Sequence, residues 1–329
     1  MLLWLDPCRQ KPMNTSQDAL PKGYVLNGEY QIEKFLGGGG FSVVYLATES
    51  ASGQKCVVKE YLPGNQAHRV GDSRVEPLSE ECESVFKFGI KRFFDEAAAL
   101  ARINHPHIVR VRNVFRANNT VYMVMSHEHG KDLRWYIKHK SGPLSERFLR
   151  TVFPKLLHGL EELHANRMLH LDIKPANIYL RPGGNPLLLD FGAARDAISD
   201  RKHRGPQTLT LGYAPLEQHR GGHLGPWTDL YAIGAAMHAC LAGVPPPPAT
   251  ERAGKDRYKP VARRFARRYS PQLLEAIDWC LRMNQLDRPQ KVLELREVLE
   301  RDASPVDGDA SPLDTLLNMN IRLPWLGRR

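Results

Sequence analysis

Short apolar runs separated by turn residues characterise the first part of the chain. Apolar and β-branched residues gather in the runs 30–36, 42–48, 55–59 and 121–125. Turn-forming residues fill 37–40 and 50–53, between the first three runs. Runs of this length bounded by turn residues are typical of β-strands joined by tight turns. We therefore expect an antiparallel meander that begins near Tyr24.

A helical spacing of apolar residues follows. Residues 93–103 carry apolar side chains at 93, 97, 100 and 103, and a stripe recurs every three or four residues in 153–164. Such spacing predicts amphipathic helices. The apolar run 230–244 is shorter than the roughly 20 residues that a membrane span needs, so we expect a buried core helix and no transmembrane span. Further helices are expected over 271–301.

The composition is that of a globular chain. Its 329 residues are 42% hydrophobic and 25% charged, enough to bury the core of one large or two modest domains. The five cysteines include no Cys-x-x-Cys pair and indicate neither a disulfide framework nor a zinc site. The amino end is apolar for only five residues, too few for a signal peptide. A cytoplasmic location fits these features.

Basic residues outnumber acidic ones by 46 to 36, which gives a net charge of +10. A positive balance favours acidic partners in general and identifies none. The basic run Arg263–Arg268 lacks the interleaved aromatic pattern of a single-strand binder and matches no nucleic-acid module. We expect a solvated helix surface there and no nucleic-acid partner.

Three segments are expected to lie outside the core. Residues 1–22 are rich in Pro, Ser, Gln and Asn, which indicates a flexible lead-in. Residues 63–84 are expected to form an exposed polar loop. The tail from Ala303 is rich in Pro, Asp and Ser and then ends Leu-Pro-Trp-Leu-Gly-Arg-Arg. Contact with a partner or a membrane surface through this tail stays open.

The stretch His170–Asn177, His-Leu-Asp-Ile-Lys-Pro-Ala-Asn, gathers the chemistry on which the functional interpretation rests. It offers a carboxylate at Asp172, an ammonium at Lys174 and an amide oxygen at Asn177. Phosphoryl transfer to a hydroxyl needs positioning and charge neutralisation of this kind. An ordinary polar turn after a helix is the alternative. The stretch resembles the catalytic loop of the protein kinase family, His-Arg-Asp-Leu-x-x-x-Asn, with Leu171 where Arg is usual.

Four consecutive glycines lie between the first two expected strands. Glycine lets backbone N–H groups approach phosphates, and its tolerance of positive φ lets a hairpin tip bend. An unremarkable hairpin turn would also use glycines. The frame Gly37-x-Gly39-x-x-Ser42-x-Val44 resembles the kinase glycine-rich loop, with Ser in the third position. The resemblance implies that ATP is bound by Leu36, Gly37, Gly38, Gly39, Gly40, Phe41, Ser42 and Val44, with Val44 as the floor of the adenine pocket.

A lysine closes the third strand in Val57-Val58-Lys59, which resembles the family's Val-Ala-Ile-Lys. A lysine in an apolar strand costs energy unless it is paired, so it either points into solvent or has a partner. By the resemblance, Glu96 pairs with Lys59 and orients it on the α- and β-phosphates. The resemblance also implies that Met125 and His127 lie at the hinge that reads the adenine. His127 and His129 alternate, but no third metal ligand is in view.

A carboxylate follows the short apolar run 187–189 in Asp190-Phe191-Gly192. An aspartate after a strand is commonly only a turn former. This tripeptide resembles the family's Asp-Phe-Gly, and it lies 18 residues after Asp172. Asp190 and Asn177 offer the hard oxygen ligands that Mg²⁺ prefers. The resemblance therefore implies that these two residues hold the metal.

The segment Thr210-Leu-Gly-Tyr-Ala-Pro-Leu-Glu217 resembles the family's Thr-x-x-Tyr-x-Ala-Pro-Glu, although Ala-Pro falls one residue early. The resemblance implies that Thr210 hydrogen-bonds Asp172 and Lys174 and helps to hold the acceptor hydroxyl. It also implies that Glu217 pairs with the Arg of Asp287-Arg288-Pro289. By the same comparison, Asp229 anchors the catalytic loop from the start of a buried helix. The Gly-Tyr-Ala-Pro-x-Glu-Gln variant is similar to the bacterial branch of these kinases.

These motifs occur in the family's order over residues 24–301. The chain resembles the bacterial branch of the eukaryotic-like (Hanks-type) serine/threonine protein kinases. The resemblance implies an α+β fold of two lobes, a small antiparallel β-sheet lobe with one helix (about 24–125) and a larger, mainly helical lobe (about 130–302). The expected domain is then 24–302, between a flexible segment 1–23 and a tail 303–329.

The resemblance implies ATP and Mg²⁺ as cofactors and transfer of the γ-phosphoryl of ATP to Ser or Thr hydroxyls of protein substrates, the chain itself included as a candidate. Asp172 would orient the hydroxyl and accept its proton, and Lys174 would neutralise the γ-phosphoryl. A nucleotide-binding pseudokinase scaffold and a small-molecule kinase are the alternatives. The retained polar catalytic positions argue against the first, and the segment around Thr210 argues against the second.

Leu171 departs from the family pattern in a way that bears on regulation. The usual Arg couples the catalytic loop to a phosphorylated activation segment, here Ala193–Glu217, and an aliphatic side chain cannot bind phosphate. We therefore hypothesise that activity does not require phosphorylation of this segment.

Overall fold

The computed structural model describes residues 18–140, 142–191, 195–196 and 209–301. The chain divides into two compact units. The first unit comprises the residues up to Asn104 together with Val109–Glu128, and the second comprises His105–Ile108 and the chain from His129 onward.

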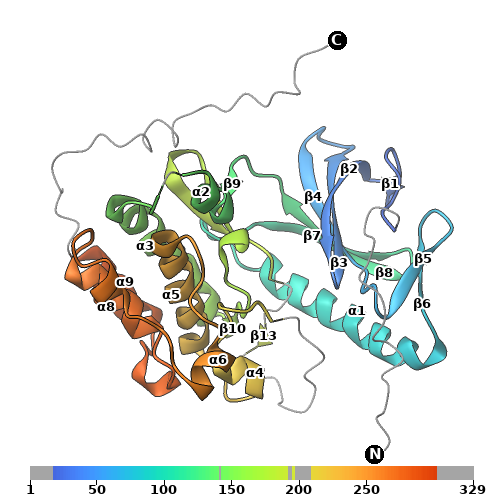
Figure 1. The fold of residues 1–329 in the computed structure, drawn as a ribbon. Helices are drawn as coiled ribbons and strands as arrows, with labels where there is room; N and C mark the ends of the chain where they lie inside the picture. The colour runs from blue at the N-terminus through green and yellow to red at the C-terminus, as the bar shows by residue number, and fades with distance from the viewer. Residues whose placement is uncertain (1–17, 141, 192–194, 197–208, 302–329) are drawn as a thin grey trace, which may run out of the picture. The chain divides into compact units, whose positions relative to one another are not determined.

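The first unit is built on an antiparallel sheet of six strands in the order β1-β2-β3-β4-β8-β7 (Figure 1). The strands are β1 Val25–Leu26, β2 Tyr30–Gly39, β3 Ser42–Glu49, β4 Lys55–Tyr61, β7 Val111–Ala117 and β8 Thr120–Ser126. The sheet confirms the expected meander, because β2, β3 and β4 pair in sequence. The predicted strand at 121–125 is β8, which lies next to β4.

Among the described residues of this unit, the one helix is α1, which spans Glu80–Ala101 and packs on the sheet. Its Phe86 and Phe93 rings contact Tyr61 of β4, with centroids 5.9 and 5.7 Å apart. The sequence prediction began this helix at residue 93 and missed its first three turns. Ser79 is the N-cap, and its hydroxyl accepts from the Cys82 amide. Cys82 is disulfide-bonded, which the cysteine spacing did not indicate.

Residues 63–84 do not form the exposed loop that the sequence predicted. They contain the hairpin of β5 (Ala67–Val70) and β6 (Arg74–Pro77), followed by the start of α1. Ala67 and Val75 are fully buried, and the Arg69 side chain is only 5% exposed. The polar composition suggested an exposed segment, but the Arg69 side chain points inward and binds a buried acid.

That acid is Glu60, which is 0% exposed in β4. Tyr45 and Arg69 donate to its Oε2 at 2.6 and 2.5 Å, and Tyr122 donates to its Oε1 at 2.5 Å. Burial raises the pKa of both tyrosine hydroxyls, so they stay protonated as donors. A buried carboxylate is tolerated only when it is paired and hydrogen-bonded, and here both conditions are met.

The same network fixes the start of the described chain. Arg69 Nε donates to the Asp18 carbonyl at 2.6 Å, and the Leu20 amide donates to the Tyr45 hydroxyl at 3.1 Å. Leu20 is 3% exposed. The predicted flexible lead-in is therefore wrong for 18–20, and residues 1–17 lie outside the described residues.

Removing the cation from Glu60 is expected to destabilise the first unit. Arg69→Met keeps much of the aliphatic volume but leaves the buried carboxylate without its ion-pair partner, a change that costs about 3–5 kcal/mol. Lys55→Met removes the cation of the exposed Lys55–Glu33 pair and is the matched control, with an expected loss below about 1 kcal/mol. The free energies of unfolding are measured by urea denaturation. A loss at Arg69 no larger than that at Lys55 would contradict this prediction.

The second unit is mainly helical within the described residues (Figure 1). Its helices are α2 Leu133–His139, α3 Glu146–Ala165, α4 Leu216–Arg220, α5 Pro226–Ala242, α6 Ala249–Gly254, α7 Val261–Arg264, α8 Pro271–Cys280 and α9 Val292–Glu300. Its short strands are β9 Lys131–Asp132, β10 Met168–Leu169, β11 Ile178–Arg181, β12 Asn185–Leu188 and β13 Arg195–Asp196. The two units together confirm the expected α+β class, a sheet lobe with one helix and a helical lobe.

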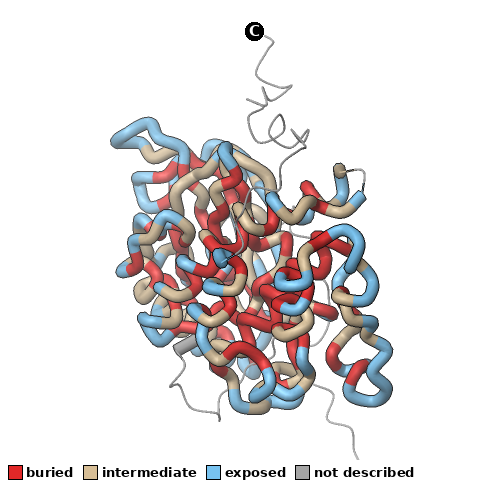
Figure 2. Tube along the Cα trace, turned by 90° about the vertical axis from the view of Figure 1, so that its left-hand side faces the viewer, coloured by how far each residue is buried: buried red, intermediate tan, exposed pale blue. Residues whose placement is uncertain are grey.

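Helix α5 is the centre of the second unit, and the apolar run 230–244 is confirmed as a buried core helix. Every residue from Thr228 to Leu241 is buried, and Figure 2 shows the buried positions inside the helical part. A Cβ on Gly234 would lie 2.4 Å from the Cys280 Cβ, so a glycine is needed where α5 meets α8. In the described residues no helix is long and apolar enough to cross a membrane.

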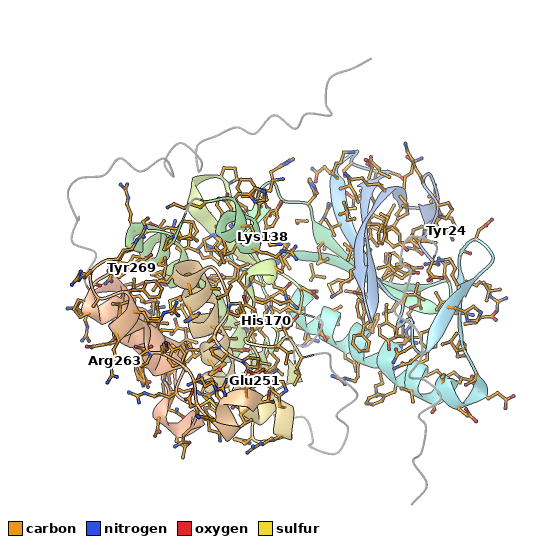
Figure 3. All side chains as sticks on the ribbon, in the orientation of Figure 1. Tyr24, Lys138, His170, Glu251, Arg263 and Tyr269 are labelled. Atoms are coloured by element: carbon orange, nitrogen blue, oxygen red, sulfur yellow. The ribbon has the colours of Figure 1, made fainter. Side chains whose placement is uncertain are left out.

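The basic run 263–268 is exposed except for the half-buried Phe265, as predicted, and Figure 3 shows Arg263 at the edge of the unit. Pro245–Pro248 connect α5 to α6, which fits the expected interhelix loop.

His238 of α5 makes the stability of this unit depend on pH. Burial lowers its pKa from 6.5 to about 4, although its hydrogen bond to the Val244 carbonyl and the charge of Asp278 act in the opposite direction. Arg264 and Arg252 also disfavour its protonation. The folded chain therefore keeps the ring neutral at pH values where the unfolded chain takes up a proton.

We expect this stabilising contribution to be complete above about pH 6.5 and to disappear as the pH falls toward 4. Between about pH 7 and about pH 4.5 the wild type should lose on the order of 1–3 kcal/mol more than His238→Gln, as urea denaturation at both pH values would measure. His139→Gln, at an exposed histidine, is the control and should follow the wild type. Parallel pH profiles for the wild type and His238→Gln would refute the prediction.

Candidate active site

The buried carboxylate of Asp229 holds the catalytic loop. Asp229 lies in the first turn of α5 and is 0% exposed. Its Oδ2 accepts from the His170 amide at 2.9 Å and from His164 Nε2 at 2.8 Å, and its Oδ1 accepts from the Leu171 amide at 2.8 Å. Burial opposes this charge, yet these donors keep the pKa of Asp229 below its usual range. The expected anchoring role of Asp229 is present in the structure.

His170 fixes the loop from the inside, and Figure 3 shows it among the side chains of the second unit. Its Nε2 lies 3.0 Å from the Leu189 carbonyl, and its Nδ1 accepts from the Asp172 amide at 3.2 Å. Burial lowers the pKa of His170. The ring is therefore a neutral tautomer that donates through Nε2, and it packs against Phe191 with centroids 4.7 Å apart.

Three polar side chains meet around the Asp172 carboxylate, from Lys174, Thr210 and Asn177. Lys174 Nζ lies 3.0 and 2.7 Å from its two oxygens, and Thr210 Oγ1 donates to Oδ1 at 3.1 Å. Lys174 also donates to Thr210 Oγ1 at 3.1 Å, and Asn177 Nδ2 donates to Asp172 Oδ2 at 3.1 Å. The predicted hydrogen bonds of Thr210 to Asp172 and Lys174 are thus present. This cluster joins residues 172–177 to the far end of the activation segment.

Asn177 also connects the loop to the strand that precedes Asp190. Its backbone carbonyl accepts from the Leu189 amide at 2.9 Å, and Ile178 pairs with Leu188 where β11 meets β12. Asp190 follows at the end of this hairpin with a φ of 57°, in the left-handed region, and is exposed. The hydrogen bond of the preceding residue, Leu189, to Asn177 brings the start of the Asp-Phe-Gly tripeptide close to the catalytic loop, and the metal-binding role of Asp190 stays a prediction. Residues 192–194 and 197–208 of the activation segment lie outside the described residues.

A buried ion pair fixes the end of the activation segment. Arg288 binds both oxygens of Glu217, at 2.7 and 3.1 Å, and the two residues are 2% and 8% exposed. The guanidinium also donates to the carbonyls of Arg282 and Met283 and lies 4.7 Å from the centre of the Tyr231 ring. Thr228 donates to Glu217 at 3.2 Å. The predicted Glu217–Arg288 pair is confirmed.

The glycine stretch lies in the first unit, at the tip of the β2–β3 hairpin. Gly37, Gly38 and Gly39 pair with Val44, Val43 and Ser42. None of the glycines 37–40 has a positive φ, so the expected use of positive φ is wrong here. A Cβ on Gly37, Gly39 or Gly40 would meet nothing within 4 Å. Space above this backbone is open to an approaching ligand.

Lys59 is buried in β4, at 6% exposure, so it is not the outward-facing surface lysine that was the alternative. It pairs in register with Val44 of β3 and Met123 of β8, which puts these three side chains on one face of the sheet. Its ammonium lies 5.8 Å from the centre of the Phe93 ring of α1. Glu96 follows on the same helix, and its pairing with Lys59 stays a prediction.

The remaining predicted nucleotide residues are also in the first unit. Met125 and His127 are half-buried at the end of β8, where Met125 pairs with Val57 and lies on the face that carries Lys59. Leu36 is 45% exposed, and Phe41 and Ser42 are half-buried at the hairpin tip. No cluster of three or more metal-ligating His, Cys, Asp or Glu side chains occurs in the described residues.

Sequence reasoning missed the roles of two polar residues. His164 was placed in a helical stripe, but it donates to Asp229. Gln218 was quoted in a motif without a role, but its Nε2 donates to the Leu171 carbonyl at 2.9 Å. A polar residue directly after Glu217, in a segment already expected to reach the catalytic loop, was the signal that could have revealed it.

Comparison with known proteins agrees with the fold and the motifs. A family model described as the protein kinase domain matches residues 30–301. The chain therefore belongs to the protein kinase domain family, and the expected resemblance is confirmed.

Its relatives include bacterial proteins named as serine/threonine-protein kinases. PknA of Nostoc sp. is 30% identical over 84% of this chain and 48% of its own length, and PrkC of Bacillus subtilis is 28% identical over 67% and 31%. The chain thus spans less than half of the length of each of these two relatives. The solved structure titled "PpkA-294 apo form" is 35% identical, with a TM-score of 0.76, over 86% of this chain and all of that one.

We expect the Asp229 carboxylate to be needed for the conformation of the catalytic loop. Asp229→Asn replaces one acceptor oxygen by an NH₂ group that faces other donors, at a cost of about 1–3 kcal/mol in the free energy of unfolding. Hydrogen exchange at the amides of His170 and Leu171 should become faster. Glu275→Gln, at an exposed acid of α8, is the control. Unchanged exchange at both amides would disprove this dependence.

Proposed function

We propose that the chain is an ATP-dependent serine/threonine protein kinase, which transfers the γ-phosphoryl of ATP to Ser or Thr hydroxyls of protein substrates. One observation carries the proposal: Lys174, Thr210 and Asn177 converge by hydrogen bonds on the single carboxylate of Asp172. This arrangement suits the reaction because phosphoryl transfer depends on an oriented nucleophile and on charge stabilisation. The names of the bacterial relatives agree with it.

In the proposed mechanism Asp172 is the base. Its carboxylate accepts the proton of the acceptor hydroxyl and aims the oxygen. Thr210 Oγ1 lies 3.1 Å from both Asp172 Oδ1 and Lys174 Nζ, so its hydroxyl occupies the side of the carboxylate where an acceptor residue would be held. Lys174 supplies a positive charge to the transferred group.

Asn177 and Asp190 are the proposed magnesium ligands. Asn177 donates through Nδ2 to Asp172, which turns the amide oxygen to the other side of the planar group. Asp190 is exposed at the end of the adjoining hairpin. An amide oxygen and a carboxylate suit Mg²⁺, which binds few protein oxygens and keeps several waters. When bound, the ion would neutralise charge on the phosphates.

The first unit would hold the nucleotide. Backbone N–H groups at Gly37–Gly40 can approach the phosphates because no side chain fills the space above them. Lys59, oriented by Glu96, would bind the α- and β-phosphates. Val44, Lys59 and Met125 share one face of the sheet, which supports an adenine site beside the phosphate site. Leu36, Phe41, Ser42 and His127 complete the proposed nucleotide contacts.

The substrates, the location and the domain limits of the chain are also proposals. Protein substrates, with this chain among them, are proposed from the names of the relatives. A cytoplasmic location and the domain limits 24–302 stay predictions. The expected contact through the tail falls on 303–329, outside the described residues. No observation favours a pseudokinase scaffold or a small-molecule kinase.

Replacing the base tests the proposed activity. Asp172→Asn keeps the size of the side chain but cannot accept the proton, so turnover should fall at least ~10²-fold. ATP binding should stay nearly intact. Transfer of radiolabel from ATP to a generic basic protein and to the chain itself is the measurement, with ATP binding measured by calorimetry. Glu275→Gln, at an exposed acid of α8, is the control. Unchanged phosphorylation by Asp172→Asn would reject the assignment, and ATP binding without any transfer by the wild type would support the scaffold.

A further inference from the structure

Helix α4 touches the catalytic loop at a point that the proposed mechanism does not use. Gln218 Nε2 donates a hydrogen bond of 2.9 Å to the carbonyl oxygen of Leu171. That carbonyl belongs to the peptide group that joins Leu171 to Asp172. The N–H of the same peptide group donates to His170 Nδ1 at 3.2 Å. Both ends of the peptide that carries the proposed base are therefore held by side chains.

The backbone of Leu171 needs such support. Its φ is 62°, in the left-handed region that branched residues rarely adopt. A residue keeps such a strained backbone conformation only where several surrounding contacts hold it. Asp229 accepts from the Leu171 N–H, and Gln218 donates to the Leu171 carbonyl. The two contacts come from different helices, α5 and α4, and act on opposite sides of the same residue.

The backbone that carries the Gln218 side chain is itself held in place. The preceding residue, Glu217, is buried and binds Arg288 through both carboxylate oxygens. The Gly222 amide donates to the Glu217 carbonyl at 2.7 Å, which closes the end of α4. A buried ion pair at residue 217 thus leaves the neighbouring side chain little freedom to move. Gln218 can act as a rigid link because of this anchor.

We propose that Gln218 is a positioning residue, which sets the orientation of Asp172 by holding the Leu171 carbonyl. The inference rests on the proposed kinase function for its kinetic part only. The Gln218 contact then adds a neutral hydrogen bond to the backbone of the catalytic loop, beside the contacts of Thr210 with the side chains of Asp172 and Lys174. The buried Leu171 side chain, 5% exposed, offers no group that could bind a phosphate.

The segment 210–218 contacts the catalytic loop at two points. Thr210 binds the Asp172 side chain, and Gln218 binds the backbone just before it. The amides of Tyr213 and Ala214 donate to the Thr210 carbonyl at 3.1 and 3.0 Å, so the intervening chain is a closed turn. Residues 210–218 therefore bracket Asp172 from two sides. Loss of the Gln218 contact would leave only the side-chain contact at Thr210.

The test compares Gln218→Ala, Gln218→Glu and the wild type after phosphatase treatment, with the absence of phosphate checked by mass spectrometry. We expect the treated wild type to keep its activity. Gln218→Ala should lower kcat about 3- to 10-fold, the effect of one neutral hydrogen bond, with the KM for ATP nearly unchanged. Gln218→Glu should be at least as impaired at neutral pH, because its carboxylate faces a carbonyl oxygen. Its kcat relative to the wild type should rise as the pH falls, since a protonated carboxyl can donate.

Hydrogen exchange gives a readout that does not need activity. In Gln218→Ala the amides of Leu171 and Asp172 should exchange faster, while those of the α5 core should not change. Gln272→Ala, at an exposed glutamine of α8, is the matched control and should resemble the wild type in both assays.

The outcomes separate this inference from the proposed function. If the wild type transfers phosphate but Gln218→Ala keeps the wild-type kcat and exchange rates, the positioning role is overturned and the kinase function stands. If the wild type is inactive but Gln218→Ala loosens Leu171 and Asp172, the link is supported and the proposed function fails.

Discussion

The conformation of the catalytic loop depends on one buried carboxylate, which accepts three hydrogen bonds. Asp229 gathers donors from His164, His170 and Leu171, and only an ionised acid can satisfy all three at once. Because these donors lie on a helix and on a loop without regular structure, the carboxylate replaces the backbone pairing that the loop lacks. The fully buried α5 supplies a rigid place for it. Asp172 is positioned by this contact together with two others, the hydrogen bond from Gln218 to the Leu171 carbonyl and the hydrogen bond from the Asp172 amide to His170.

The same physical solution recurs elsewhere in the chain. Glu60 in the first unit and Glu217 in the second are also buried acids, and each binds an arginine from outside its own strand or helix. A buried charge is costly alone and is tolerated when its partner is present. Such pairs are therefore specific: Arg69 fixes the β5–β6 hairpin on the sheet, and Arg288 fixes α4. Polar contacts specify where peripheral segments attach, whereas apolar burial builds the cores.

The sequence predicted most of what depends on local pattern. The strands from Tyr30 to Lys59, the buried helix after Thr228 and the neighbours of Asp172 all follow from spacing and motif. It failed where a polar residue turns inward: Arg69 made 63–84 look exposed, and the partner that buries it cannot be read from adjacent residues. The start of α1 was missed because Val85 and Phe88, 43% exposed each, break the apolar stripe in its first turns. The glycine hairpin was recognised, but its extended φ values depend on strand pairing rather than on glycine's freedom.

The hydrogen bond between Gln218 and the Leu171 carbonyl differs from an arginine–phosphate link in how it can be formed and broken. A link between arginine and phosphate is made and broken by adding or removing charge, and salt screens it when it is exposed. The Gln218 link is a neutral hydrogen bond between α4 and the catalytic loop. Arg288 holds α4 through a buried pair, so the backbone that carries Gln218 is fixed by contacts within the second unit. The position of Asp172 therefore depends on the packing of residues 210–218, because both the Thr210 contact and the Gln218 contact come from this segment.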